Sequence, residues 1–234
     1  VMIKHLFLIW GLLAALTAEP VLACTSAVVS GKVTPDGRPL LWKNRDTDFM
    51  RNHVDYVKGE RYDFIAVVNS ANAYLKEAWM GTNSAGFALM NTQSYNLVDV
   101  KGDEERGAAN GRVIYRALEV CATVEDFCHF LDTISKPSDI EANFGVIDAQ
   151  GGAAMFEVDY YKYVMYDANN PKDAPYGYIA RTNFSFAGKV NEGAGYVRYM
   201  EADQVLMKAS ATGNITPQFI FNDLSRSFRN RMLD

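Results

Sequence analysis

The residue best suited to do chemistry in this chain is Cys24, which follows a short apolar segment near the N-terminus. If processing cuts the chain between Ala23 and Cys24, the mature protein begins with a thiol whose nearest base is its own α-amino group. A free α-amine has a pKa of about 7.7–8.0 and a thiol one of about 8.5, so the amine can take the thiol proton near neutral pH. One residue would then supply both nucleophile and base, and no histidine would be needed.

Histidine-based chemistry finds little support in the sequence. The histidines are His5, in the leader, His53, in a polar stretch that we expect to form a loop, and His129. His129 adjoins Cys128 in a helical pattern, where neighbouring residues point to different faces and cannot form a dyad. No GxSxG elbow, phosphate loop or dinucleotide fingerprint is present. We therefore expect neither a Cys-His pair, nor a metal site, nor a bound cofactor.

The N-terminal segment has the pattern of a signal peptide. Lys4 and His5 form a weakly basic start, residues 6–18 are apolar and uncharged, and Val21-Leu22-Ala23 offers short residues before the cut. The apolar run is too short to span a bilayer comfortably and lacks a stop-transfer flank. The sequence therefore predicts a signal peptide at 1–23, a domain at 24–234, export to the periplasm or the exterior, and no stable membrane span after processing.

A second interpretation of the same segment stays open, because a cysteine directly after the cut also resembles a lipoprotein cleavage box. Lipidation of Cys24 would block its amine and its sulfur together, so the chain would then be a surface-anchored binding protein. Leu22 is a poor fit to that box. The mass of the mature N-terminus distinguishes the two interpretations.

Composition excludes some partners. The 234 residues are 49% hydrophobic and 22% charged, with a formal net charge of −5, which is ordinary for a soluble globular domain. No basic cluster is interleaved with aromatic residues, so we expect no nucleic-acid partner. The chain ends within a charged, helix-like stretch at 219–233 that has no capping signal, and we therefore expect the domain to be truncated. A homo-oligomer stays open.

Charged residues alternate along the stretch 40–46, which has the pattern of a strand. Leu41, Lys43 and Arg45 share one face, while Asp46 lies on the other with Trp42. A cation or carboxylate turned inward at such a strand end must be paired. The N-terminal amine or the thiolate of Cys24 could be its partner. The alternative is an ordinary charged loop after a strand.

The elements that must position these residues follow a simple order. Strands are predicted at 25–30, 39–43, 64–69, 77–80, 87–93, 143–148, 153–159, 163–167 and 178–182. Helices are predicted at 111–122, at 124–134 after a Thr123 cap, and at 194–210. Strands, helices, strands and a final helix indicate an α+β layered fold, since βαβ units would alternate.

Two short motifs near the start carry a family resemblance. Cys-Thr-Ser at 24–26 and, after a Pro-Asp-Gly turn, Leu-Trp-Lys-Asn-Arg-Asp at 41–46 resemble the opening of the N-terminal nucleophile (Ntn) hydrolases that act on linear amides. This group includes the choloylglycine (bile salt) hydrolases, the penicillin V acylases and the acyl-coenzyme A:6-aminopenicillanic acid acyltransferases. The resemblance implies that Cys24 is the nucleophile and that Asp46 holds its α-amine. Lys43 stands where two of the branches carry arginine.

Three later segments extend the resemblance, which covers residues 24–202. The segment 81–91, Gly-Thr-Asn-Ser-Ala-Gly-Phe-Ala-Leu-Met-Asn, implies that Asn91 is an oxyanion donor. Arg-Thr-Asn-Phe at 181–184 implies that Asn183 lies at the reaction centre as a second oxyanion donor, and the segment 196–202 implies that Arg198 lies there too. The candidate catalytic residues are therefore Cys24, Lys43, Asp46, Asn91, Asn183 and Arg198.

The resemblance also implies a fold and a substrate class. It implies a four-layer αββα sandwich and a small-molecule linear amide that is hydrolysed or used for acyl transfer. A related Ntn dipeptidase is the alternative enzyme, because those enzymes also begin with Cys-Thr and carry an Arg-Asn-x-Asp strand.

Overall fold

The computed structural model describes residues 24–98 and 107–227, which form two antiparallel sheets and four α-helices. The predicted signal peptide at 1–23 lies outside these residues, as does the end of the helix expected at 219–233.

Strand order shows how the two sheets are built. The smaller sheet has the order β10 (Tyr178–Arg181), β1 (Thr25–Val29), β2 (Leu40–Asn44). The larger sheet runs in sequence order through β3 (Asn52–Val57), β4 (Phe64–Asn69), β5 (Met80–Asn83), β6 (Ala88–Gln93), β7 (Ala142–Ile147), β8 (Ala153–Val158) and β9 (Tyr163–Asp167). The first strand of the chain is therefore the centre of the smaller sheet, with a neighbour on each side.

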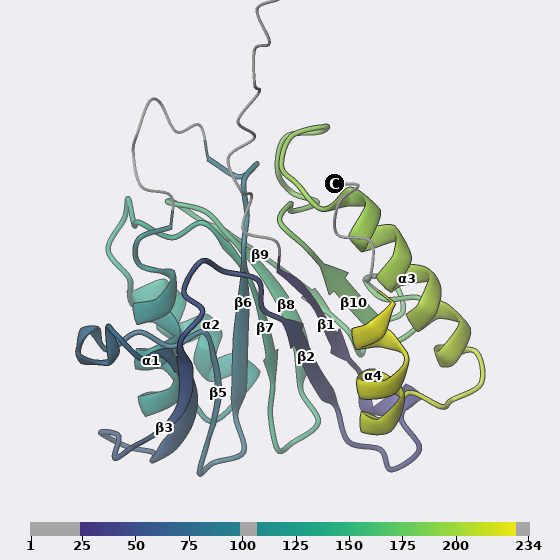
Figure 1. Ribbon diagram of the computed structural model, residues 1–234, viewed down its shortest axis with the longest axis horizontal. Helices are drawn as coiled ribbons and strands as arrows, with labels where there is room; N and C mark the ends of the chain where they lie inside the picture. Colours follow the sequence, from purple (N-terminus) through teal and green to yellow (C-terminus); the bar gives the residue numbers. More distant parts are fainter. Residues whose placement is uncertain (1–23, 99–106, 228–234) are drawn as a thin grey trace, which may run out of the picture.

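The helices cover the outer faces of the two sheets (Figure 1). The helices are α1 (Asn110–Val120), α2 (Val124–Thr133), α3 (Tyr196–Ser210) and α4 (Pro217–Asn222), and short 3₁₀ turns form at Gly31–Val33, Ala73–Leu75 and Leu224–Arg226. The predicted Thr123 cap begins α2, where its hydroxyl accepts from the Asp126 amide while the Asp126 carboxylate accepts from the Thr123 amide.

The burial pattern of β1 shows why the molecule has four layers. Ala27 and Val29 pack with residues of α3 and α4, whereas Val28 packs with Met90 and Met155 of the larger sheet. Because successive strand residues point to opposite faces, a strand that is buried along its whole length must lie between two layers. The order is therefore helices, larger sheet, smaller sheet, helices, which is the predicted αββα sandwich.

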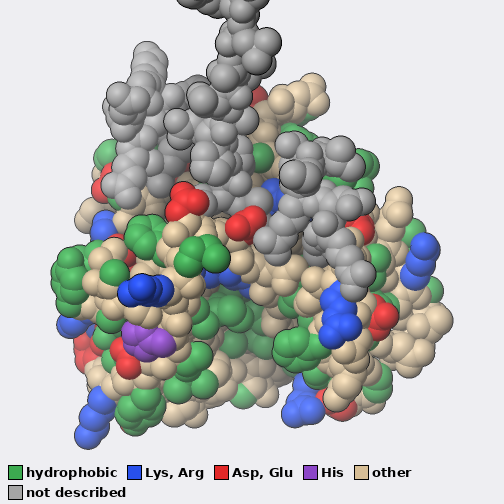
Figure 2. All heavy atoms as spheres, viewed as in Figure 1, with side chains coloured by type: hydrophobic (Ala, Val, Ile, Leu, Met, Phe, Trp, Pro, Cys, Tyr) green, Lys and Arg blue, Asp and Glu red, His purple; other side chains and the backbone are tan. Residues whose placement is uncertain are grey.

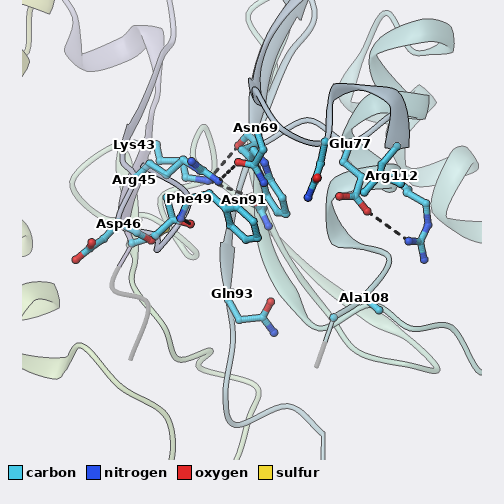
Figure 3. A pocket seen from close by; sticks show the side chains of 16 residues that line it. Lys43, Arg45, Asp46, Phe49, Asn69, Glu77, Asn91, Gln93, Ala108 and Arg112 are labelled. Carbon is cyan, nitrogen blue, oxygen red and sulfur yellow. Dashed lines mark hydrogen bonds and ion pairs between the residues drawn. The ribbon is translucent and has the colours of Figure 1, made fainter. Parts of the chain in front are cut away.

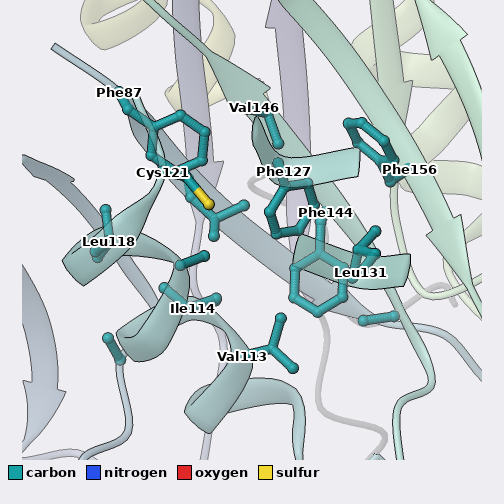
Figure 4. Packing of buried hydrophobic residues seen from close by; sticks show 14 of the residues in the cluster. Phe87, Val113, Ile114, Leu118, Cys121, Phe127, Leu131, Phe144, Val146 and Phe156 are labelled. Atoms are coloured by element: carbon teal, nitrogen blue, oxygen red, sulfur yellow. The ribbon is translucent and has the colours of Figure 1, made fainter. Parts of the chain in front are cut away.

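The largest core lies between the larger sheet and the helices α1 and α2. Phe127 of α2 is fully buried there, and its ring meets those of Phe144 and Phe156 edge-on, at centroid distances of 5.9 and 5.0 Å (Figure 4). Leu118 of α1 and Leu131 of α2 belong to the same cluster. This closely packed core fixes α1 and α2 against the larger sheet.

The structure corrects two expected segments of the larger sheet. Residues 52–57 form β3, whereas a polar loop around His53 was expected. β3 is an edge strand that pairs only with β4, and Val54 is 65% exposed, so its pattern lacks the burial that marks inner strands. The strand expected at 77–80 begins at Met80 instead, because the Ala78 amide donates to the Gly111 carbonyl at the start of α1.

The helix expected at 219–233 is also corrected. Within the described residues it is shorter and begins earlier, as α4 (Pro217–Asn222), and is followed by the 3₁₀ turn at Leu224–Arg226. Thr216 caps α4 and Pro217 occupies its first turn, a helix start that the sequence analysis did not use.

An apolar groove opens between β2 and strands β3 to β6, and hydrophobic side chains gather in the hollow at the centre of Figure 2. Its volume is about 410 Å³, and it is lined by Leu41 of β2, Val67 of β4 and Met80 of β5, among others. Within the described residues, no helix combines the length and the apolar character that crossing a membrane requires.

Candidate active site

A cavity of about 470 Å³ lies where one end of the smaller sheet meets the larger sheet and the start of α1 (Figure 3). Cys24 lines it together with residues from β2 and the loop that follows, namely Lys43, Arg45, Asp46, Thr47 and Phe49. The opposite side is built from the larger sheet and its loops and from the start of α1, namely Asn69, Asn72, Leu75, Glu77, Trp79, Asn91, Gln93, Gly107, Ala108 and Arg112.

Cys24 lies immediately before β1, and the sheet register brings it to the cavity. Thr25 pairs with Asn44 in the antiparallel ladder, so the preceding residue falls beside the loop after β2. The Cys24 thiol donates to the backbone carbonyl of Asp46, at an Sγ···O distance of 3.6 Å. Only 8% of the residue is exposed. A thiol placed in this way reaches the cavity and is shielded from bulk water.

Lys43 extends into the cavity from the face of β2 that also carries Leu41, as the alternation of the sequence predicts. Its Nζ donates to the Trp79 carbonyl and to Asn91 Oδ1, both at 3.1 Å. Burial lowers the pKa of Lys43 from 10.5 to about 8, a shift that the neighbouring Cys24 thiolate opposes and Arg45 reinforces. Lys43 is therefore a cation that can lose its proton slightly above neutral pH.

Asn91 lies on β6 and is 3% exposed. Its Oδ1 accepts from Lys43, which fixes the orientation of the amide. Among the hydrogen bonds between residues that the structure describes, none uses the Asn91 Nδ2. The amide nitrogen is thus an N–H donor, held in place by its own oxygen, in the cavity that contains the cysteine.

Asn183 and Arg198 lie behind the cysteine and do not line the cavity. Arg198, in the first turn of α3, donates from Nη1 to the Cys24 carbonyl at 2.7 Å and to Thr25 Oγ1 at 3.0 Å. Its Nη2 donates to Asn183 Oδ1 at 3.1 Å, and Asn183 Nδ2 donates to the Gln93 carbonyl at 2.9 Å. The two residues therefore tie the backbone of Cys24 to β6 and α3.

The approach of Arg198 to the cysteine depends on a glycine. Gly195 precedes α3 with a φ of +88°, and a Cβ there would lie 2.5 Å from Arg198 Nη2 and 2.8 Å from the Thr182 side chain. A side chain at this position would strain the backbone and displace the guanidinium. The start of α3 is thus shaped around the contact to Cys24.

The six predicted site residues form two groups in the structure. Cys24, Lys43, Asp46 and Asn91 line one cavity, while Asn183 and Arg198 contact the backbone and the network beside it. All six therefore lie in or beside one cavity, and their catalytic roles stay predictions.

Sequence reasoning missed Arg45 as a site residue. Its guanidinium lines the cavity, lies 5.1 Å from the centre of the Trp79 ring, and donates to Asn69 Oδ1 at 2.8 Å and to Asn52 Oδ1. The alternation that placed Lys43 inward also places Arg45 there, so that signal was present. Asn69 and Trp79 belong to other strands and loops, and no local pattern links them to the cysteine.

Glu77 and Arg112 form an ion pair at the rim of the cavity, with 3.4 Å between Glu77 Oε1 and Arg112 Nη1. The Arg112 side chain is 53% exposed, so this pair closes the rim but adds little stability. Over residues 24–98 and 107–227, no cluster of three or more His, Cys, Asp or Glu side chains has the arrangement of a metal site.

Comparison with known proteins identifies relatives of this chain. A family model described as "Acyl-coenzyme A:6-aminopenicillanic acid acyl-transferase" matches residues 33–212, which is more than half of the chain. No curated protein sequence is a significant match.

Two solved structures show the same fold. An N-acylethanolamine-hydrolyzing acid amidase ortholog from Caenorhabditis elegans is 16% identical with a TM-score of 0.57, and the match covers 86% of this chain and 89% of that one. A mutant conjugated bile acid hydrolase from Clostridium perfringens is 15% identical with a TM-score of 0.51, and the match covers 86% of this chain and 74% of that one. These likenesses confirm the Ntn-hydrolase fold that the sequence predicts.

Proposed function

The chain belongs to the acyl-coenzyme A:6-aminopenicillanic acid acyl-transferase family, and from this premise we propose that Cys24 opens the mature protein and attacks a linear amide bond. One observation carries the proposal. The Cys24 thiol shares its cavity with the Lys43 ammonium and with an Asn91 amide that Lys43 holds in place. A nucleophile, a cation that favours the thiolate, and an N–H donor are the groups that acyl transfer through a thioester requires.

The proposed reaction has two halves. The α-amine of Cys24 takes the thiol proton, and Sγ bonds to the amide carbonyl carbon while the oxygen becomes an oxyanion. The C–N bond then breaks, and the amine leaves with the proton held by the α-amine. Water, or an acceptor amine, attacks the resulting thioester, which releases a carboxylic acid or a new amide and restores the thiol. Asp46 orients the α-amine in this scheme.

Arg198 and Asn183 act on the nucleophile through its backbone. Two hydrogen bonds from Arg198, to the Cys24 carbonyl and to Thr25, limit the motion of the residue that must meet the carbonyl carbon. Precise placement of this kind removes much of the entropic cost of bringing two groups together. Asn183 keeps Arg198 in place, and its own Nδ2 already donates to the Gln93 carbonyl, so we assign the oxyanion to Asn91.

Export and processing complete the proposal, and they rest on the leader pattern at 1–23. The mature N-terminus is best tested by intact mass after expression with the native leader. A chain that begins with an unmodified Cys24 supports the enzyme. A diacylglyceryl adduct on the same residue would favour the lipidated binding protein instead.

The reaction itself is tested by the adduct that substrates leave on Cys24. The mature protein is mixed with a panel of N-acyl amides and dipeptides, quenched within one turnover, and analysed by peptide mass. An acyl mass on Cys24 from the amides supports the proposal. Turnover of dipeptides with no adduct from other amides would favour the dipeptidase, and no adduct from any member would refute both.

Loss of the proton from Lys43 should set the alkaline limb of the profile of activity against pH. Below about pH 8 its ammonium is charged and favours the Cys24 thiolate, and this support is lost as pH rises through that pKa. Lys43→Arg keeps the charge and should therefore move the alkaline limb of kcat/KM upward by at least about one pH unit. The exposed Lys208→Arg is the matched control, and an unmoved limb in Lys43→Arg would contradict this role.

Alanine substitutions of Asn91 and Asn183 should affect the rate and the stability differently. Asn91→Ala should lower kcat about 100- to 1000-fold with little change in KM, since an oxyanion donor acts mainly in the transition state. Asn183→Ala should lower the rate and also cost about 1–3 kcal/mol of stability, because the buried Arg198 and the Gln93 carbonyl each lose a partner. Single-turnover rates and thermal melting check this, with the exposed Asn214→Ala as control. An Asn91→Ala variant with the rate of the unmodified enzyme would remove Asn91 from the site.

A further inference from the structure

Cationic side chains outnumber carboxylates in the cavity, where the carboxylates among the described residues are those of Asp46 and Glu77. Three cations line it, and Arg112 pairs with Glu77. The other two, Lys43 and Arg45, contact neutral groups: carbonyl and carboxamide oxygens and the Trp79 ring. The two like charges on the same face of one strand repel each other and lose solvation, so an anion in the cavity, the Cys24 thiolate or a ligand, relieves that cost.

Arg45 is the better prepared of the two to receive that anion. Its guanidinium is held on two sides by the carboxamide oxygens of Asn52 and Asn69 and lies over the ring of Trp79. Two of its five N–H groups are engaged in those bonds, which leaves others for a ligand. Burial lowers the pKa of Arg45, and the negative charge of the neighbouring Cys24 thiolate opposes this shift.

We propose that Arg45 binds a carboxylate carried by the substrate, so that the enzyme selects amides with a carboxylate a few bonds from the scissile C–N bond. This inference rests on the proposed function and names the substrate class of that site. A planar guanidinium matches a carboxylate with two parallel hydrogen bonds, whereas an ammonium acts as a point charge. Arg45 also directly precedes Asp46, whose carbonyl accepts from the Cys24 thiol, which keeps the bound carboxylate close to the reacting atoms.

Lys43 does not fill this role, because its ammonium already donates to the Trp79 carbonyl and to Asn91. Those bonds commit it to the amide that we assign to the oxyanion. Within the described residues, Arg45 forms no hydrogen bond with Asn91 or with the Cys24 thiol. The two cations therefore have different roles. Lys43 acts at the reacting bond, and Arg45 selects the substrate.

The first test does not depend on turnover. Iodoacetate and iodoacetamide alkylate the same sulfur and differ by a carboxylate, so the ratio of their rates on Cys24 cancels any change in thiolate content. We expect Arg45 to raise the iodoacetate-to-iodoacetamide ratio about tenfold over that of the Arg45→Gln variant. Arg45→Lys should fall between them. Arg38→Gln, which removes an exposed charge before β2, should leave the ratio unchanged.

The second test uses substrates and locates the carboxylate. N-acylglycines are compared with their N-acylglycinamides, and monoamides of glutaric acid with their methyl esters, so the carboxylate lies on the amine side in one pair and the acyl side in the other. We expect kcat/KM to favour the acid about tenfold in one pair, and Arg45→Gln to abolish that preference. Thermal melting confirms that the variant is folded.

The outcomes separate this inference from the proposed function. If Arg45→Gln and the unmodified protein show the same alkylation ratio, the carboxylate site is refuted, whether or not amides are turned over. If the ratio depends on Arg45 but no amide forms an adduct with Cys24, the anion site stands and the proposed function fails. A preference for neutral substrates by the unmodified enzyme would also overturn the inference.

Discussion

Replacing Cys24 with alanine is expected to lower the single-turnover rate on an amide by roughly 10⁴-fold or more, because no other group in the cavity can form the thioester. Cys24→Ser should retain only a trace of activity, since a hydroxyl is far less acidic than a thiol. Both variants should melt close to the unmodified protein, because each removes or replaces a single atom at the edge of the core. The measurement is a quenched single-turnover assay beside thermal melting.

Cys128→Ala is the matched control for this experiment. Cys128 is also a free thiol, but it lies on α2, where its sulfur contacts Met165 far from the cavity. Its loss should leave the rate unchanged. A Cys24→Ala variant that retained the rate, or a Cys128→Ala variant that lost it, would show that Cys24 is not the nucleophile.

Leaving Ala23 in front of Cys24 is expected to suppress turnover about 100- to 10,000-fold while the domain stays folded. The retained residue converts the α-amine into a peptide nitrogen, which cannot accept the thiol proton, and general-base catalysis of this kind is worth about that factor. The rate is measured before and after a specific protease releases Cys24, so the same sample serves as its own control.

Recovery of activity on release of Cys24 is the result that supports a base within the same residue. The recovered activity should rise with pH through a limb near neutrality that belongs to the amine and thiol as a coupled pair. Full activity in the uncleaved protein would show that another group takes the proton. His53→Ala and His129→Ala test the remaining candidates, and neither should alter the limb.

Much of the architecture could be predicted from the sequence, wherever a local pattern reflects burial or helix capping. Alternation along 40–46 put Leu41, Lys43 and Arg45 on one strand face, and in the structure Leu41 packs beside Val28 while Lys43 and Arg45 line the cavity. The Thr123 cap predicted where α2 begins. The prediction failed at β3, an edge strand with few buried residues, and at the start of β5, where a contact between Ala78 and Gly111 replaced the expected pairing. Local patterns describe burial and caps, but not which distant backbone group a strand end will meet.

The candidate site could be predicted only in part, because the sequence gives the order of the motifs and not their arrangement in space. The resemblance to Ntn hydrolases singled out Cys24 and Asn91, and alternation turned Lys43 inward. Neither signal revealed that Lys43 bonds to Asn91 across 48 residues of sequence.

Only the tertiary structure decided how the site is assembled and what surrounds it. Arg198 reaches the Cys24 carbonyl from 174 residues away, because α3 packs on the smaller sheet and Gly195 leaves room for the guanidinium. Arg45 became a candidate for substrate selection once Asn69 and Trp79 were found around it. These contacts join separate strands and helices, so they depend on how the layers pack. Local sequence patterns do not show which distant residues pack together, so these contacts become visible only in the folded chain.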